Sequence, residues 1–200
     1  FLADLAVIES MLLAYGILSL SRSHYILSIA SCVLVCIVGA PMFWGLSGTI
    51  QPHEYPQSWY MFQTELAEKV EKPNVLFLPW HLYMPFDFTN YATIGNPAKD
   101  FFTHANIIQG DNLEMHKGNT TIATQSAQPI SKKVEMVLSE LTSPNFSSAL
   151  KTLLEEEHVT YITLAHGSPE EAPYKAVLRD LPYLHVEQEM PGLTVYRFKE

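Results

Sequence analysis

The side chains best suited to chemistry gather in one stretch without clear periodicity, residues 79–129. Three segments in it or at its edge, LPWHLY from Leu78, IGNPAKDFF from Ile94 and IIQGDNLEM from Ile107, mix aromatic rings with carboxylates and amides. Aromatic faces stack on sugar rings, and carboxylate and amide oxygens accept hydrogen bonds from sugar hydroxyls. The sequence therefore predicts a ligand-binding role for eight residues: Trp80, His81, Tyr83, Asp87, Asn90, Asn96, Asp111 and Asn112.

The same residue types also have a simpler interpretation, which the sequence leaves open. Asn96-Pro97 and Gly110-Asp111-Asn112 are typical turn formers. Asn and Asp side chains bond their own backbone, and glycine adopts positive φ at little cost. Their role is then to shape the loop rather than to hold a ligand.

Metal and cofactor chemistry is not indicated by the spacing of the candidate ligands. The stretch contains enough histidines and aspartates for a zinc or calcium site, but no HExxH, HxH or DxDxDG pattern organises them. The glycine patterns of a nucleophile elbow, a phosphate loop or a dinucleotide fold are also missing from the sequence. We expect no metal and no cofactor, and no residue is identified as catalytic. The residues considered as metal ligands are His81, His104, His116, Asp87, Asp100 and Asp111.

The elements that must position these side chains follow from periodicity in residues 51–200. Helical spacing predicts three longer helices, beginning near Ser58, Ser131 and Ser143, and a short one over 174–180. β-rich runs predict strands over 75–78 and 159–165, and a hairpin of 184–190 and 193–198 around Pro191-Gly192. This order is typical of a small α/β domain with a central sheet and a C-terminal β-hairpin.

Two features near the predicted strands bear on the site. The long stretch begins at the carboxyl end of strand 75–78, the side where open α/β sheets bind ligands. His158 and His166 flank strand 159–165, and we interpret them as marking its exposed ends.

Residues 1–50 differ in kind from the remainder, because only Asp4, Glu9 and Arg22 carry a formal charge there. Residues 25–50 are uncharged and long enough to cross a bilayer core of about 30 Å, and residues 1–20 are predicted as a second span. The fold class expected is thus an α-helical transmembrane hairpin at 1–50 followed by the α/β domain at 51–200. Arg22, in a tight loop at 21–24, places that loop in the cytoplasm by the positive-inside tendency.

These features predict an integral plasma-membrane protein with residues 51–200 extracytoplasmic. Net charge is -9 and 16% of residues are charged, which excludes a disordered acidic tail and a basic nucleic-acid binder. The expected partners are the lipid bilayer and upstream transmembrane helices of the same protein, with no nucleic acid.

The paired spans and the LPW, GNPAKDFF and GDN segments resemble the C-terminal region of polytopic GT-C-like membrane glycosyltransferases, which use polyprenyl-phosphate sugars. The resemblance covers most of residues 25–200. It implies a fragment lacking the catalytic N-terminal part, because no residue here matches the family's catalytic acidic position. It also implies lipid-linked sugar or a glycan acceptor as ligand, with the outer domain assisting acceptor binding or bracing the membrane core.

Two other functions remain open from the sequence. One is a non-catalytic, membrane-anchored interaction or structural module. The other is a metal-dependent hydrolase seated in the long loop, which requires bound metal at a fixed stoichiometry.

Overall fold

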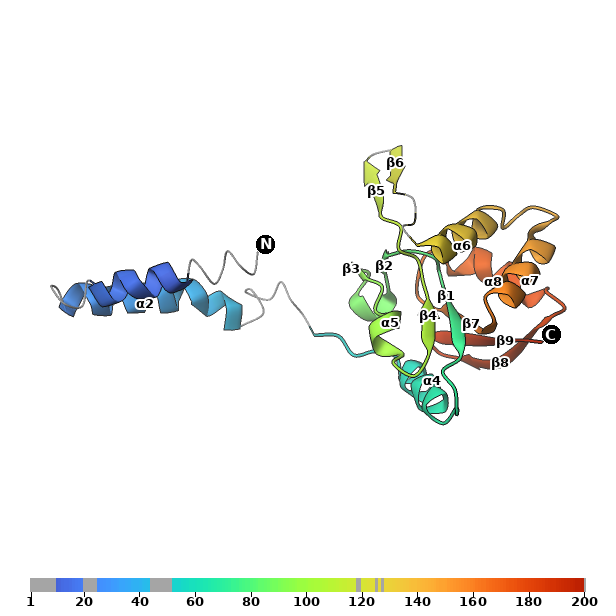
Figure 1. Cartoon of the computed structure of the whole chain (residues 1–200), viewed down its shortest axis with the longest axis horizontal. Helices are drawn as coiled ribbons and strands as arrows, with labels where there is room; N and C mark the ends of the chain where they lie inside the picture. Colours follow the sequence, from blue (N-terminus) through green and yellow to red (C-terminus); the bar gives the residue numbers. More distant parts are fainter. Residues whose placement is uncertain are drawn as a thin grey trace. The chain divides into compact units, whose positions relative to one another are not determined.

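The computed structural model describes residues 10–19, 25–43, 52–117, 120–124, 126 and 128–199. The chain divides into two compact units, Phe1–Pro52 and His53–Glu200. In the first unit, residues 10–19 are helical and α2 runs over Tyr25–Phe43. The strands that the structure describes all belong to the second unit (Figure 1).

The predicted membrane hairpin is not found. Among the described residues, no helix is both long and apolar enough to cross a membrane. Of the uncharged run at 25–50, the structure describes α2, the 19 residues Tyr25–Phe43. The described helical part of the first predicted span is only 10–19. The transmembrane hairpin, the integral plasma-membrane localisation and the extracytoplasmic position of residues 51–200 are therefore wrong. The remaining residues of the predicted spans and the loop at 21–24 lie outside the described ranges.

The second unit is built on a five-stranded mixed sheet in the order β4-β1-β7-β9-β8. β1 pairs in parallel with β4 and β7, whereas β9 is antiparallel to both β7 and β8. The carboxyl ends of β1, β4 and β7 therefore share one edge of the sheet with the β8–β9 turn. The strands are β1 (Asn74–Leu78), β4 (Asn106–Ile108), β7 (Val159–Ala165), β8 (Leu184–Met190) and β9 (Leu193–Phe198).

One face of the sheet is covered by α6 (Pro129–Ser139), α7 (Phe146–Glu156) and α8 (Glu171–Arg179) (Figure 1). Side chains alternate along a strand, so Leu76 and Leu78 of β1 face this layer, and Trp80 continues the same alternation beyond the strand end. We call this the helix-side core. Its other buried members include Val134, Leu138, Phe146, Leu150, Leu154, Ile162, Leu164 and Tyr196.

The opposite face carries an aromatic core, centred on Trp59 of α4 (Gln57–Ala67). The Trp59 ring lies 5.2 Å from that of Phe102 and 6.0 Å from that of Phe86, centroid to centroid. All three side chains are fully buried. Because rings from the segment after β1 join this core, that segment is held against the sheet. Its elements are β2 (Tyr83–Pro85), η1 (Asp87–Thr89), β3 (Thr93–Gly95) and α5 (Ala98–Phe101).

The stretch predicted as aperiodic, 79–129, therefore contains short elements. β2 pairs with β3, β4 joins the main sheet, and β5 (Glu114–Lys117) pairs with β6 (Thr120–Ala123). Elements of three or four residues are too short to display a repeating pattern, which is why the sequence did not predict them.

The longer elements lie close to their predicted positions. Strands 75–78 and 159–165 are present as β1 and β7, and the hairpin as β8 and β9. The first helix ends at Ala67, before Val70, which is exposed. The other helices begin at Pro129, Phe146 and Glu171.

Candidate functional site

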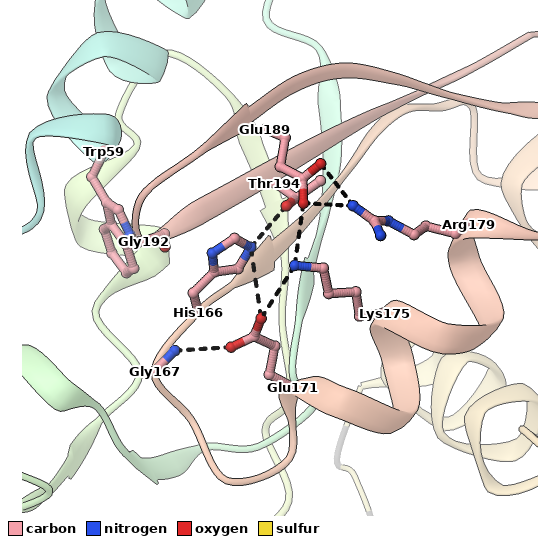
Figure 2. Close-up of polar contacts among 9 residues, drawn as sticks. All are labelled: Trp59, His166, Gly167, Glu171, Lys175, Arg179, Glu189, Gly192 and Thr194. Carbon is pink, nitrogen blue, oxygen red and sulfur yellow. Dashed lines mark hydrogen bonds and ion pairs between the residues drawn. The ribbon is translucent and has the colours of Figure 1, made fainter.

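Polar residues from three strand ends and one turn meet at the carboxyl edge of the sheet. His81 follows β1, Gly110 follows β4, His166 follows β7, and Gly192 lies in the β8–β9 turn. Open α/β sheets bind ligands at this edge. Figure 2 shows its β7 and β9 side, with α8 alongside.

His166 is the centre of a cluster that also contains Thr194 of β9 and Glu171 of α8. Its Nε2 lies 2.7 Å from Thr194 Oγ1 and 3.9 Å from Glu171 Oε1 (Figure 2). The His166 side chain is 16% exposed. Burial lowers the pKa of His166 below its ordinary value, Glu171 opposes that effect, and Lys175 adds to it. The net effect favours the neutral imidazole.

Gly167 links this cluster to Asp87. Its backbone N–H donates to Glu171 Oε2 at 3.1 Å (Figure 2). Its φ is +79°, and a Cβ at this position would lie 2.7 Å from Asp87 Oδ2. Only glycine combines this backbone conformation with so close an approach of the carboxylate.

A chain of ion pairs ties α8 to β8 beside the cluster. Lys175 Nζ lies 3.9 Å from Glu171 Oε1 and 3.2 Å from Glu189 Oε1. Arg179 Nη2 donates to both Glu189 oxygens, at 2.6 and 2.7 Å (Figure 2). Hydrogen bonds from Lys175 and then Arg179 lower the pKa of Glu189. Both cations are thus engaged by Glu189, and they fix the end of β8 relative to α8.

The other half of the edge is organised around His81. Its Nε2 contacts Glu170 Oε2, and its carbonyl accepts a hydrogen bond from Asn96 Nδ2 at 3.2 Å. A Cβ on Gly110 would lie 2.6 Å from the His81 backbone nitrogen. Glycine after β4 therefore permits the two strand ends to approach closely.

An apolar cavity of about 700 Å³ adjoins the cluster. Asp87 belongs to both the His166 cluster and the cavity, because its exposed carboxylate lies against Gly167 and also lines the cavity. Gly192 is common too, since its carbonyl accepts hydrogen bonds from Trp59 Nε1 at 3.4 Å and from His166 N at 3.1 Å. The lining residues are Pro56, Gln57, Ser58, Met61, Asp87, Phe88, Met190, Pro191 and Gly192.

The cluster is not arranged as a nucleophilic triad. In such a triad the acid and the nucleophile engage opposite ring nitrogens of the histidine. Here Thr194 and Glu171 both face Nε2 of His166, at 2.7 and 3.9 Å. The geometry favours binding over hydroxyl-based catalysis.

The structure brings some of the predicted site residues together and separates others. His81 lies beside Gly110, after β4, whereas Asp87 lies beside Gly167, after β7. Trp80 is only 4% exposed and belongs to the helix-side core, so its ring is not available for stacking on a ligand. Tyr83, on β2, is exposed.

The predicted amide and acid residues mostly shape the backbone. Asn96 is buried, and its Oδ1 accepts from Ala98 N at 3.1 Å. Asn90 ends η1 in the left-handed conformation, with φ 53°. Asp111 Oδ2 accepts from Gln128 N at 3.3 Å, and Asn112 is buried. These contacts match the turn-forming interpretation that the sequence left open.

Sequence reasoning missed His166, Gly167, Glu171 and Thr194 as site residues. A signal for two of them was present, since His166-Gly167 follows a buried strand directly, and ligands bind at the carboxyl ends of parallel strands. The positions of Glu171 and Thr194 depend on how α8 and β9 pack, which no local pattern encodes.

Within the residues that the structure describes, no group of three or more His, Cys, Asp or Glu side chains is placed to hold a metal ion. Comparison of the chain with protein-family models, curated proteins and solved structures finds no match. The resemblance to glycosyltransferases thus receives no support from known relatives.

Proposed function

We propose that the unit His53–Glu200 is a glycan-binding domain whose ligand occupies the cavity beside Asp87. The observation that carries this proposal is a carboxylate at the border of an apolar cavity that also contains an aromatic ring. Sugars present hydroxyl donors on one side and an apolar C–H face on the other. A carboxylate and a ring placed together fit both.

The ring in question, Phe88, is held in place by its neighbours. It stacks on Phe86 with centroids 4.8 Å apart, and it lies 5.8 Å from Trp59 and 5.5 Å from Tyr55. Phe88 remains half-buried while Phe86 and Trp59 are fully buried. A rigid, partly exposed ring loses little conformational entropy when a ligand stacks on it.

The size and position of the cavity also support the proposal. Its volume, about 700 Å³, falls in the range of roughly 300 to 1,000 Å³ typical of small-molecule sites. It borders the edge of the sheet where α/β proteins bind ligands. Acceptor binding is one of the two roles that the glycosyltransferase resemblance implies, and this proposal adopts it.

The proposal is tested by titrating the whole chain with a panel of mono- and disaccharides. Binding is measured by isothermal calorimetry or ligand-observed NMR. We expect saturable binding that Asp87→Asn and Phe88→Ala each weaken by about tenfold, the equivalent of about 1.4 kcal/mol. Asp180→Asn, an exposed carboxylate at the end of α8, is the matched control and should bind normally. Absence of saturable binding across the panel overturns the proposal and favours the interaction-module alternative.

A further inference from the structure

The cavity beside Asp87 has a wall of hydrogen-bond donors that a plain sugar hydroxyl does not fully use. Pro56, Gln57 and Ser58, at the start of α4, line it. The first N–H groups of a helix have no acceptor within the helix; in α4 the Trp59 N–H donates to the Pro56 carbonyl at 2.9 Å, which leaves the Gln57 and Ser58 N–H groups as donors, and no described side chain caps the helix. The positive end of the helix dipole also favours an acceptor group there.

Ser58 gives independent evidence that this wall takes a ligand. The residue is 3% exposed, and its Oγ has no hydrogen-bond partner among the described residues. A Cβ on Gly192, across the cavity lining, would lie 3.1 Å from that oxygen. A buried hydroxyl without a partner is costly, by about 1–3 kcal/mol, unless something outside the chain satisfies it.

The remaining lining has a different character. Among the described residues that line this cavity, Asp87 alone carries a formal charge, and its carboxylate is an acceptor. Met61, Met190 and Pro191 add apolar surface, and methionine adapts to small irregular groups. A well-matched ligand therefore needs an acceptor, a donor and a small apolar group close together.

We propose that the ligand of this cavity is an acetamido sugar, a refinement that rests on the glycan-binding function proposed above. Its amide carbonyl accepts from the Ser58 hydroxyl and the α4 N–H groups, and its N–H donates to Asp87. Its methyl group packs on the methionine and proline surface, while the sugar ring stacks on Phe88.

Other substituents fit this lining less well. A free amine pairs with Asp87 but leaves the donors at Ser58 and α4 unmatched. A carboxylate satisfies those donors but meets the negative charge of Asp87. A hydroxyl supplies no methyl group for the apolar wall.

The test compares three sugars that differ only at one carbon: N-acetylglucosamine, glucose and glucosamine, each titrated into the full chain. We expect N-acetylglucosamine to bind about tenfold more tightly than glucose, the gain from one hydrogen bond and one buried methyl group. Ser58→Ala should weaken N-acetylglucosamine binding more than glucose binding and so remove most of this preference. Ser131→Ala, a buried serine of α6 outside the cavity, is the matched control and should keep the preference.

The outcomes separate the two proposals. Equal affinity for glucose and N-acetylglucosamine overturns the acetamido inference and leaves glycan binding intact. Tightest binding of glucosamine also overturns it, because an ammonium–carboxylate pair then decides recognition. Absence of binding by all three sugars and by the wider panel overturns glycan binding itself, whereas binding of other sugars alone overturns only the acetamido inference.

Discussion

His166 makes the stability of the second unit sensitive to acid. Its pKa is lowered in the folded protein, chiefly by burial, so between the unfolded value of about 6.5 and the folded value the unfolded chain binds more protons. The free energy of unfolding therefore falls as pH is lowered through that window. The charged groups around the imidazole are Glu171 and Lys175 of α8, Glu189 of β8 and Asp87 of η1.

Urea midpoints measured about one pH unit above and below the ordinary histidine pKa of about 6.5 check this prediction. His166→Gln keeps a polar side chain near Thr194 but does not titrate, so its midpoint should change less with pH than that of the native chain. His185→Gln, on an exposed position of β8, should retain the native dependence. Equal pH dependence in the native chain and His166→Gln contradicts the prediction.

Gly167 is the second residue whose chemistry the site requires. Gly167→Ala places a methyl group against the Asp87 carboxylate in a backbone conformation with φ +79°, and strain of this kind costs about 1–3 kcal/mol. We expect lower stability in urea unfolding and weaker ligand binding, because Asp87 must move. Gly95→Ala is the matched control, since its Cβ would meet only the Tyr83 ring, at 3.8 Å. An unchanged urea midpoint for Gly167→Ala is the contrary result.

The segment that follows β1 is an element fixed by packing, and Trp80 is its anchor in the helix-side core. Trp80→Ala removes a side chain that is 4% exposed, and such truncations cost about 3–5 kcal/mol. Trp80→Phe should cost clearly less, because Nε1 of Trp80 has no hydrogen-bond partner among the described residues. Thermal and urea unfolding of the two variants measure the loss of stability in each. Equal losses in Trp80→Ala and Trp80→Phe contradict the prediction. Loss of binding in Trp80→Ala alone thus reports on folding rather than on ligand contact.

How far the elements could be predicted depended on their length. β1, β7 and β9 were predictable because each contains β-branched and aromatic residues, and β8 was predictable because the Pro191-Gly192 turn pairs it with β9. β4 was not, since its three residues, Asn106–Ile108, acquire their place only by pairing with β1.

The residues of the candidate site also divide into those that local sequence indicates and those that only tertiary packing brings together. His81 and Asp87 were predicted as site residues from their type and from their position after a strand, and the structure places both at the strand-end edge. The partnership of Glu171 with the Gly167 N–H was not, because it arises from the docking of α8 against the sheet. Trp80, predicted as a ligand-binding ring, lies in the helix-side core, because the side-chain alternation of β1 continues past its last paired residue, which no sequence pattern marks.

At the scale of the molecule, the uncharged run at 25–50 was interpreted by its length alone. The length of an uncharged run limits how long an apolar membrane-spanning segment can be, but it does not show that such a segment forms. Within this run the structure describes α2, over Tyr25–Phe43, and no described helix is both long and apolar enough to cross a membrane. The low charge of residues 1–50 therefore does not bear on which function the second unit performs.

The division into two units leads to a prediction about independence. Every residue of the helix-side core and of the aromatic core lies after residue 52, as do all lining residues of the Asp87 cavity. Hydrophobic burial is the main favourable term in folding. A chain beginning at His53 should therefore unfold at the same urea midpoint as the full chain, and it should bind sugar with the same affinity. Parallel urea and calorimetric titrations of the two chains check this. A lower midpoint in the shorter chain shows that the first unit contributes to the fold, and lost affinity at an unchanged midpoint shows that it contributes to the site instead.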